Sequence, residues 1–283
     1  MEETIKRIID KVDEWKPYRF SVKAKTENDV IIGFTGPQVR ACFLRAISSI
    51  DSKLAEELHS PNTPAPYSVI PIAKIEYQNG KRILKFSDNL KLKKNESVMF
   101  SITLLSRSIY ERLNISKLLG ALGTRIQIGN TNLAVSSFYI DRLEVRVDTI
   151  QSVKRFQVYF ETPTFFRRKS SNYRALFPDP PVIFPSIARI FGKLLEVKLD
   201  IDAIKEEVSK NVGVLSYNLH TTKTIDIGRG RKIVGFVGKC IYECANEITA
   251  RLVYVLLKIG EIMNVGGSRT LGFGVIKCKP TKA

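Results

Sequence analysis

The spacing of apolar residues divides the chain into short strands and amphipathic helices. Alternating apolar and polar positions in YRFSVKA, residues 18–24, predict a first strand. Between Gly36 and Pro61, apolar residues recur at intervals of three and four, which predicts one helix with a single apolar face. These residues are Val39, Phe43, Ile47, Ile50, Leu54 and Leu58. Gly36-Pro37 suits the start of this helix, and Pro61 ends it.

The next segment, residues 67–87, predicts a β-hairpin. Its two apolar runs flank Asn79-Gly80, a dipeptide typical of tight two-residue turns. A further strand, SVMFSITLL, leads into a helix at about residues 107–119, and residues 132–148 supply a long final strand or hairpin. The first half of the chain therefore has the order β-α-β-β-α-β.

The second half repeats this order of elements. Residues 154–163 predict a strand and residues 180–198 contain a helix. Residues 212–243 predict a hairpin whose turn lies in GRGR, followed by a helix over residues 245–263 and a last strand over residues 270–280. We therefore predict an α+β fold of two tandem ferredoxin-like domains, RRM-like β-α-β-β-α-β units. The predicted domains span residues 1–149 and 150–283, and the halves share element order without visible sequence identity.

The charge of the chain points to a polyanionic partner. The formal net charge is +17, and residues 151–283 carry 22 basic against 11 acidic side chains. So large an excess favours nucleic acid first and an anionic membrane surface second, with a lysine-rich solvated surface as the alternative. No apolar run is long enough to span a membrane, and the N-terminus lacks the apolar region of a secretion signal, so we predict no membrane partner.

The cysteines and histidines argue against a metal centre. Cys42, Cys240, Cys244 and Cys278 are scattered without a CxxC pair, which favours buried thiols in a reducing cytoplasm. Only two histidines exist and neither lies near a cysteine, so zinc is not expected. No carboxylate cluster suited to Mg²⁺ is apparent, and we predict no cofactor and no metal.

A glycine-rich stretch, NVGGSRTLGFGVIKC, lies close to the end of the chain. It follows a predicted helix and precedes a strand, the reverse of the order in nucleotide-binding glycine loops. Glycines permit positive φ and close backbone approach, while Ser268 and Arg269 add a hydroxyl and a forked cation suited to phosphate. The alternative is a glycine helix cap before a bulged strand, which needs only one glycine.

The stretch from Gly266 to Gly274 resembles the glycine-rich signature of the repeat-associated RNA-binding superfamily of CRISPR systems. The whole chain more closely resembles the CRISPR-associated endoribonuclease family six, which cuts CRISPR precursor transcripts within each repeat. Three features carry this resemblance: the glycine stretch, the two ferredoxin-like halves, and Leu58-His59 before a PYS strand start. It implies metal-independent cleavage, in which the ribose 2′-hydroxyl attacks the adjacent phosphate and leaves a 2′,3′-cyclic phosphate and a 5′-hydroxyl.

The resemblance also implies site residues. His59 matches the family's catalytic histidine by placement, although a histidine ending a helix also suits the helix dipole. Some members place a tyrosine and a lysine where this chain has Leu44 and Ala65. We therefore expect basic residues to replace them, and we predict the catalytic set His59, Lys25, Arg231 and Arg269.

Basic clusters supply the predicted RNA contacts. The hairpin stretch TTKTIDIGRGRKIVGFVGK can brace an RNA stem or can be a charged strand that resists aggregation. TPTFFRRKSSNYR places Phe165-Phe166 beside three cations, which indicates single-strand binding or a loop anchored by two phenylalanines. His220 is expected to be structural. The predicted RNA-binding residues are Lys23, Arg45, Lys53, Arg167, Arg168, Lys169, Lys223, Arg229, Lys232, Gly266, Gly267, Ser268, Gly272 and Gly274.

Three functions remain open at this point. The first is a cytoplasmic endoribonuclease that binds and cleaves CRISPR repeat RNA. The second, kept open by Leu44 and Ala65, is a non-catalytic CRISPR RNA-binding protein or a subunit of a CRISPR effector complex. The third is a basic ferredoxin-like protein acting on ribosomal or transfer RNA. The sequence leaves open whether the chain forms a homodimer.

Overall fold

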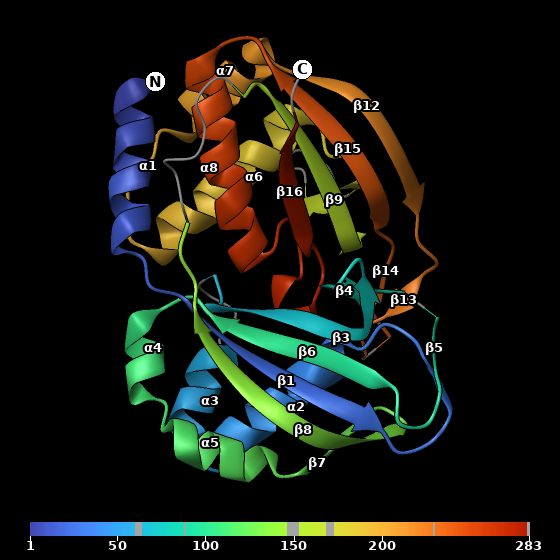
Figure 1. The fold of residues 1–283 in the computed structure, drawn as a ribbon. Helices are drawn as coiled ribbons and strands as arrows, with labels where there is room; N and C mark the ends of the chain where they lie inside the picture. Colours follow the sequence, from blue (N-terminus) through green and yellow to red (C-terminus); the bar gives the residue numbers. More distant parts are fainter. Residues whose placement is uncertain (60–63, 88, 146–152, 168–172, 229, 282–283) are drawn as a thin grey trace.

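The structure, a computed structural model, describes residues 1–59, 64–87, 89–145, 153–167, 173–228 and 230–281. Two β-sheets dominate it, and each has helices against one face (Figure 1). The predicted boundary between residues 149 and 150 lies outside the described residues. Of the described helices, none is both long enough and apolar enough to cross a membrane.

The N-terminal unit has a six-stranded antiparallel sheet in the order β4-β3-β6-β1-β8-β7. Its central four strands, β3-β6-β1-β8, have the strand order of a ferredoxin-like unit, and β4 and β7 add a hairpin at each edge. The elements are β1 (Tyr18–Thr26), β2 (Val30–Ile32), α2 (Gly36–Ser48), α3 (Ser52–His59), β3 (Tyr67–Gln78), β4 (Lys81–Lys85), β5 (Leu90–Leu92), β6 (Ser97–Leu104), α4 (Arg107–Arg112), α5 (Ile115–Leu122), β7 (Arg125–Ile128) and β8 (Thr131–Arg142).

The C-terminal unit has a four-stranded antiparallel sheet in the order β12-β15-β9-β16, again the ferredoxin-like order. The predicted α+β fold with two tandem ferredoxin-like units is therefore confirmed. The elements are β9 (Arg155–Thr164), β10 (Phe166–Arg167), β11 (Arg174–Ala175), α6 (Pro180–Leu194), α7 (Ile201–Asn211), β12 (Val212–Thr221), β13 (Ile225–Asp226), β14 (Lys232–Ile233), β15 (Phe236–Cys244), α8 (Glu247–Met263), a 3-10 turn (Arg269–Leu271) and β16 (Ile276–Thr281).

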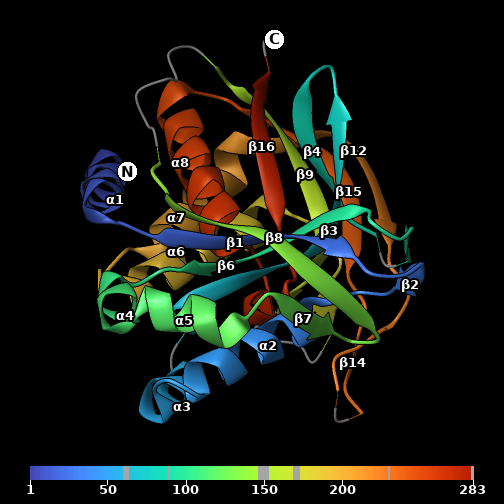
Figure 2. The same cartoon turned by 60° about the horizontal axis from the view of Figure 1, so that its bottom comes forward.

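Each unit buries one face of its sheet under helices. In the N-terminal unit, Phe20, Val22 and Ala24 of β1 face the core that α2 and α3 complete. Figure 2 shows these helices and α5 on one side of the sheet. In the C-terminal unit, alternate residues of β9, Phe156 and Val158 among them, pack under α6 and α8. This alternation along each strand is what the period of two in the sequence indicated.

Two helices were not predicted from the sequence. The first, α1 (Glu2–Glu14), precedes the N-terminal unit in the chain but packs on the core of the C-terminal unit. Trp15 ends it, with its ring edge-to-face against Phe191 at 5.5 Å and its indole nitrogen donating to Leu105 O at 2.8 Å. The second is α7. Helix α1 therefore links the two units, and Figure 1 shows it beside α8.

The single helices predicted over residues 36–59 and 107–119 are each divided in two. A new helix starts where a polar side chain caps it: Asp51 accepts a hydrogen bond from Leu54 N, and Asn114 accepts one from Lys117 N. Such caps satisfy free amides at a helix start and allow the chain to turn between two helices. The apolar period continued across both breaks, so periodicity alone did not show them.

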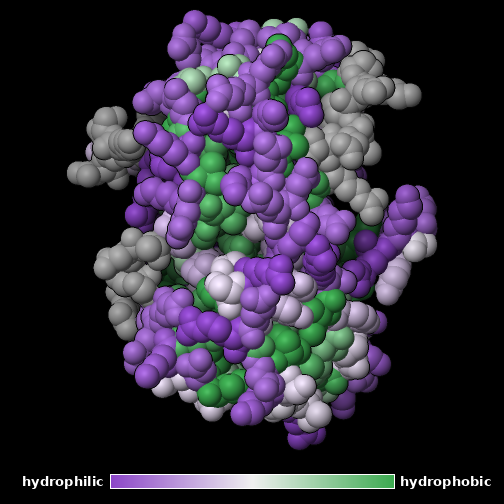
Figure 3. Space-filling view, turned by 90° about the vertical axis from the view of Figure 1, so that its left-hand side faces the viewer, coloured by the Kyte–Doolittle hydropathy of each residue, from purple (hydrophilic) through white to green (hydrophobic). Residues whose placement is uncertain are grey.

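Polar contacts join the two units across the sheet face that α2 and α3 leave open. Ser68 donates to Ile262 O at 3.1 Å, and Asn264 donates to Val69 O at 2.8 Å. Arg19 donates to Thr103 Oγ1 and to Glu261 O, and burial lowers the pKa of its guanidinium. The end of α8 and the loop after it are therefore held against strands β1, β3 and β6. Over the face seen in Figure 3, hydrophilic residues predominate.

Candidate active site

The glycine loop, defined here as residues 264–274, passes between the two units. Its backbone has positive φ at Asn264, Gly266, Ser268, Gly272 and Gly274, the left-handed region that favours glycine. A Cβ at Gly274 would lie 1.8 Å from Val265 O, and one at Gly266 would lie 2.3 Å from Phe165 O. The glycines therefore permit close packing of the loop against the protein itself.

Accessibility divides the loop into two parts. Gly266, Gly267 and Ser268 are partly exposed, whereas Gly272 and Gly274 are buried. Gly272 packs between Pro71 of β3 and Gly36 of α2, so it joins the units. Gly272 and Gly274, which the sequence predicted as direct RNA contacts, are thus buried against the protein itself.

Arg269 is also turned inward. Its side chain is 7% exposed, and Nη1 donates to Met263 O at 2.9 Å, at the C-terminal end of α8. A cation is favourable at that negative end of a helix, although burial lowers the pKa of Arg269 to about 10. The catalytic role predicted for Arg269 conflicts with this position, which is that of an anchor between the loop and α8.

His59 stands in a polar cluster where the loop meets the N-terminal unit. Arg40 of α2 places Nη2 2.8 Å from His59 Nδ1 and donates from Nε to the Tyr67 hydroxyl at 2.8 Å. The Thr270 side chain, from the glycine loop, forms a hydrogen bond with the same hydroxyl. Helices α2 and α3, strand β3 and the loop thus each supply one side chain.

The side chains of the cluster differ in how deeply they are buried. His59 is exposed, Arg40 is half-buried and Tyr67 is fully buried. Burial raises the pKa of Tyr67, against the opposing effect of the Arg40 charge, so the phenol stays neutral at ordinary pH. A neutral phenol held by Arg40 and Thr270 fixes the guanidinium while one edge of the cluster remains open to solvent.

Arg40 was not predicted from the sequence as a site residue, and Tyr67 was not given a role. A lone arginine on an amphipathic helix is more often a solvated charge than a site residue. The available signal was that Arg40 lies four residues, one helical turn, before Leu44, the position where some relatives carry tyrosine. The two residues share a face of α2, so a side chain at either position can approach the same region.

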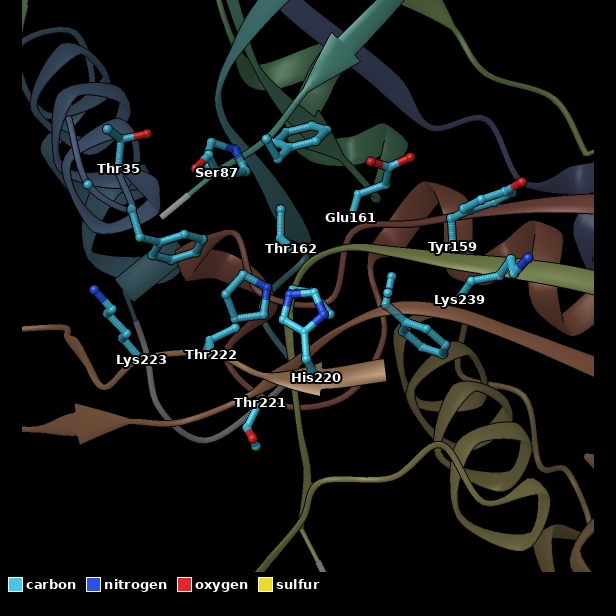
Figure 4. Close-up of a pocket in the computed structure, with 18 of the residues that line it drawn as sticks. Thr35, Ser87, Tyr159, Glu161, Thr162, His220, Thr221, Thr222, Lys223 and Lys239 are labelled. Atoms are coloured by element: carbon cyan, nitrogen blue, oxygen red, sulfur yellow. The ribbon is translucent and has the colours of Figure 1, made fainter. Parts of the chain in front are cut away.

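A cleft lies on the other side of the glycine loop, between the open face of the C-terminal sheet and residues 33–35 and 86–87 of the N-terminal unit. It has a volume of about 640 Å³. Figure 4 shows His220 near its centre, with Lys223 and Lys239 on opposite sides. Thr162, a residue of its wall, donates to Gly272 O at 2.8 Å, so the cleft and the loop are directly connected.

His220 was expected to be structural, but its side chain is exposed in this cleft. Tyr159 lies on the same open sheet face, opposite Lys239 on one side and Lys277 on the other. The ammonium of Lys279 lies 5.3 Å from the centre of the Tyr159 ring. Cations around a partly exposed aromatic ring are an arrangement suited to single-stranded nucleic acid.

The basic hairpin of the C-terminal unit is formed by β13 and β14. Ile225 and Ile233 at its base pack with Phe165 and Phe273 in a small apolar cluster beside the glycine loop. Its exposed cations are Lys223, Arg231 and Lys232. Figure 2 shows β14 extending toward the same side of the molecule as α2 and α3. Arg229 lies outside the described residues.

Two predicted contributors lie elsewhere. Tyr67 is opposite Leu104, which is opposite Tyr18, so the His59 cluster lies near the start of β1. Lys25 is seven residues further along β1, about 23 Å away at 3.3 Å per residue. The structure therefore does not bring Lys25 to His59, and Lys23 is only two residues closer. Arg45 and Lys53 are exposed on α2 and α3, the two helices that contribute to the cluster.

Phe165 and Phe166 are not available for base stacking, because each is 1% exposed. They anchor a loop instead, which was the alternative predicted for this stretch. The guanidinium of Arg174 lies over the Phe165 ring, 4.9 Å from its centre. Arg167 is exposed, while Arg168 and Lys169 lie outside the described residues.

Metal-binding groups do not gather in the part of the chain that the structure describes. No cluster of three or more His, Cys, Asp or Glu side chains is placed there to hold an ion. The four cysteines are free, and burial raises the pKa of Cys240 to about 11.

Family models match both units of the chain. The model of the CRISPR Cas6 N-terminal domain matches residues 17–145, and that of the CRISPR-associated endoribonuclease Cas6 matches residues 158–276. The Cas6 endoribonuclease of Streptococcus thermophilus is 32% identical over 129 residues, 45% of this chain and 51% of that protein. That of Mycobacterium tuberculosis is 27% identical over 128 residues, 45% of this chain and 40% of that protein. The chain thus aligns with about half or less of the length of these relatives.

Solved structures show the same fold. A product complex of a Thermus thermophilus Cas6 has a TM-score of 0.70 at 15% identity, covering 93% of this chain and 99% of that one. At this level of identity the likeness concerns the fold, and it extends over both ferredoxin-like units.

Proposed function

The chain belongs to the Cas6 family of CRISPR-associated endoribonucleases, and on this premise we propose that it cuts CRISPR precursor RNA within each repeat. The cut is metal-independent: the ribose 2′-oxygen attacks the adjacent phosphorus, the bond from phosphorus to the 5′-oxygen breaks, and a 2′,3′-cyclic phosphate and a 5′-hydroxyl remain. The observation that carries the proposal is the 2.8 Å contact between Arg40 Nη2 and His59 Nδ1 beside the glycine loop.

His59 acts as a hydrogen-bond donor to the leaving group in this proposal. A guanidinium has only donors, so His59 Nδ1 accepts from Arg40, and the ring carries its N–H on Nε2. That N–H donates a hydrogen bond to the 5′-oxygen as negative charge develops on it; the 5′-oxygen takes its proton from water, and the 2′-hydroxyl proton passes to water. A positioned donor of this kind contributes about 10²- to 10³-fold to such reactions.

Arg40 replaces, in this proposal, the tyrosine or lysine that some relatives have beside the histidine. Two of its five N–H groups are directed to His59 and Tyr67, which fixes the guanidinium plane. The other N–H groups and the positive charge are then available to the phosphate as negative charge develops on it. Donors fixed in advance of the reaction stabilise such charge without reorganisation.

The RNA path follows the exposed cations. The loop residues Gly266 to Ser268 and the β13–β14 hairpin, with Arg231 at its tip, hold the backbone near the cut. The cleft beyond the loop takes unpaired nucleotides against Tyr159 and His220, where base stacking is worth about 1–3 kcal/mol per base. Lys23 and Lys25 contact RNA only at a distance from the cut. Further proposed contacts are Arg45, Lys53, Arg167, Lys223 and Lys232.

A second function is favoured by one specific observation. Leu44 and Ala65 have hydrocarbon side chains that cannot transfer a proton, and both pack against the N-terminal core. We propose, as the alternative, that the chain binds repeat RNA without cutting it, alone or within a CRISPR effector complex. In either function we place the protein in the cytoplasm, where free thiols persist.

One experiment separates these functions. Repeat RNA is mixed with excess protein in EDTA, beside a matched RNA with a single 2′-deoxy at the cut position. Endoribonuclease function predicts cleavage of the first RNA only, with a cyclic phosphate on the upstream product. Tight binding of both RNAs without product supports the binding function, and cleavage that requires a divalent metal contradicts the mechanism. Failure of repeat RNA to outcompete ribosomal and transfer RNA contradicts the substrate assignment.

A further inference from the structure

Glu161 is the only acidic residue among the described residues that line the cleft beside the glycine loop. The other titratable side chains of the lining with positive or neutral forms include Lys223, Lys239 and His220. The chain has a net charge of +17, and the proposed function places unpaired RNA in this cleft. A carboxylate there repels each phosphate that comes near, so it weakens RNA binding unless it contacts another part of the nucleotide.

The fold does not depend on this carboxylate. Glu161 Oε1 lies 3.6 Å from Lys277 Nζ, beyond hydrogen-bond distance, and the two side chains are 23% and 44% exposed. Exposed ion pairs of this kind contribute little to stability. In the described part of the chain, no donor forms a hydrogen bond with the carboxylate. Both of its oxygens are therefore available to a ligand.

An irregularity in the sheet places Glu161 at the cleft. Residues 161–163 of β9 lie opposite a single residue of β15, Val237. Bulges of this kind re-aim side chains and are over-represented next to active sites. The backbone at Glu161 is nevertheless fixed, because its N–H donates to Val275 O at 2.9 Å. The carboxylate thus projects from a rigid part of the strand.

Tyr159 precedes Glu161 by two residues on the same strand, a separation of about 7 Å. Figure 4 shows both side chains projecting from the same side of β9, and both line the cleft. The Tyr159 hydroxyl accepts a hydrogen bond from Gln157 Nε2, which restrains the ring. A base stacked on this ring has its edge within reach of the Glu161 carboxylate. Proteins read single-stranded RNA in this way, with an aromatic ring on the face of the base and a polar group on its edge.

We propose that Glu161 selects guanine in the unpaired part of the RNA. An ionised carboxylate only accepts hydrogen bonds. Guanine presents two adjacent donors on its Watson–Crick edge, N1–H and N2–H, which match the two carboxylate oxygens in a bidentate pair. Adenine and cytosine present one amino group beside an acceptor nitrogen, and uracil presents one N–H between two carbonyl oxygens. Because these acceptors repel a carboxylate, guanine is preferred to all three.

The guanosine selected by Glu161 lies in the flank of the cut site. Thr162, the next residue along β9, donates to Gly272 O at 2.8 Å and so connects this part of the cleft to the glycine loop. A repeat with guanosine at the matching position is therefore held in one register relative to the loop. This inference rests on the proposed function for the place of unpaired RNA in the cleft, but it does not require that the RNA is cut.

Fluorescence anisotropy with short RNAs tests the selectivity. The probes are oligouridines of about nine nucleotides, one unsubstituted and the others with a single central guanosine, adenosine or cytidine. We expect the guanosine probe to bind about tenfold more tightly than the other three. A probe with inosine, which lacks the N2 amino group of guanosine, should keep only about threefold of this preference.

The outcomes separate this inference from the proposed function. Dissociation constants of the four standard probes that agree within about twofold overturn guanine selection and leave the assignment of RNA cleavage intact. Failure of all the probes to bind contradicts the placement of unpaired RNA in the cleft, and the inference with it. Cleavage of repeat RNA is measured separately and affects neither result.

Glu161→Gln replaces one of the two acceptors with a donor and removes the charge. We expect the preference for guanosine to disappear, while unsubstituted oligouridine binds as tightly as before or more tightly because a repulsive charge is lost. The matched control is Glu243→Gln: the Glu243 carboxylate lies 2.6 Å from Arg155 Nε on the same sheet, and neither residue lines the cleft. This variant should keep the wild-type preference. In variants that circular dichroism shows to be folded, a preference that persists in Glu161→Gln, or that is lost equally in both, contradicts the role of Glu161.

Discussion

Substitution of Arg40 by methionine tests the chemistry of the His59 cluster most directly. Methionine keeps much of the side-chain length and apolar packing but removes the cation and both hydrogen bonds of 2.8 Å. His59 then loses the donor that selects its tautomer, and the phosphate loses a fixed positive charge. Removal of one preorganised donor costs about 10²- to 10³-fold in the rate constant of a reaction that builds charge on oxygen.

We therefore expect Arg40→Met to lower the single-turnover cleavage rate constant by about 10²- to 10³-fold. The binding of uncleavable 2′-deoxy RNA should weaken by less than about tenfold, because one phosphate contact among many is lost. Arg40→Lys keeps the charge but cannot reach both partners, and its rate should fall between the two.

The assay is denaturing gel analysis of product over time, with protein in excess over repeat RNA. Arg107→Met is the matched control: Arg107 is an exposed helix arginine whose partner is Glu111, four residues along the same helix. Circular dichroism shows whether each variant is folded. A cleavage rate constant of Arg40→Met within about threefold of the wild type, in a folded protein, would refute the proposed role of Arg40.

Three further predictions concern His59, the glycine loop and the charge of the surface. His59→Ala removes the donor to the 5′-oxygen and should lower the rate constant by about 10²- to 10³-fold with little change in affinity. His220→Ala should instead mainly weaken binding of the unpaired flank, and titrations with 2′-deoxy RNA measure both affinities. Gly274→Ala should cost more than about 3 kcal/mol in thermal or denaturant unfolding, because its Cβ would meet Val265 O at 1.8 Å with φ at +73°. Gly120→Ala, in a helix with nothing within 4 Å, should instead leave stability unchanged or raise it. Affinity for repeat RNA should fall steeply and log-linearly with salt, and a flat dependence would contradict a phosphate-binding surface.

The fold could be predicted because its determinants are local. The alternation in β1 and β9, the three- and four-residue spacing in α2, and the Asn79-Gly80 turn each depend on neighbouring residues only. Both turn residues have positive φ in the structure, as a two-residue hairpin requires. The undetected break between α2 and α3 is also local in origin, but the Asp51 cap is a weaker signal than the apolar period that crosses it.

The site could be predicted only in part, because it depends on strand register and on contacts between units. No feature of the sequence around Lys25 indicates that the His59 cluster lies at the Tyr18 end of β1, away from Lys25. Similarly, Arg269 and Ser268 are neighbours in a polar stretch, yet one is buried against α8 and the other is partly exposed. Which of two adjacent polar residues faces solvent is decided by the loop conformation, and the positive φ at Ser268 is part of it.

Contacts between the two units also explain the number of glycines in the loop over residues 264–274. Each of the two units could fold with an ordinary turn between its last helix and last strand. Here that turn must pass over Phe165 of its own unit and then fit between α2 and β3 of the other, where Gly272 lies against Gly36 and Pro71. Thr270, two residues before Gly272, reaches the Tyr67 hydroxyl from this position. Side chains at the glycine positions would push the loop away from α2, and Thr270 would lose Tyr67. Close packing of the loop is therefore a condition for the geometry of the cluster, and a stability defect at Gly274 should be accompanied by slower cleavage even though that residue lies too deep to touch RNA.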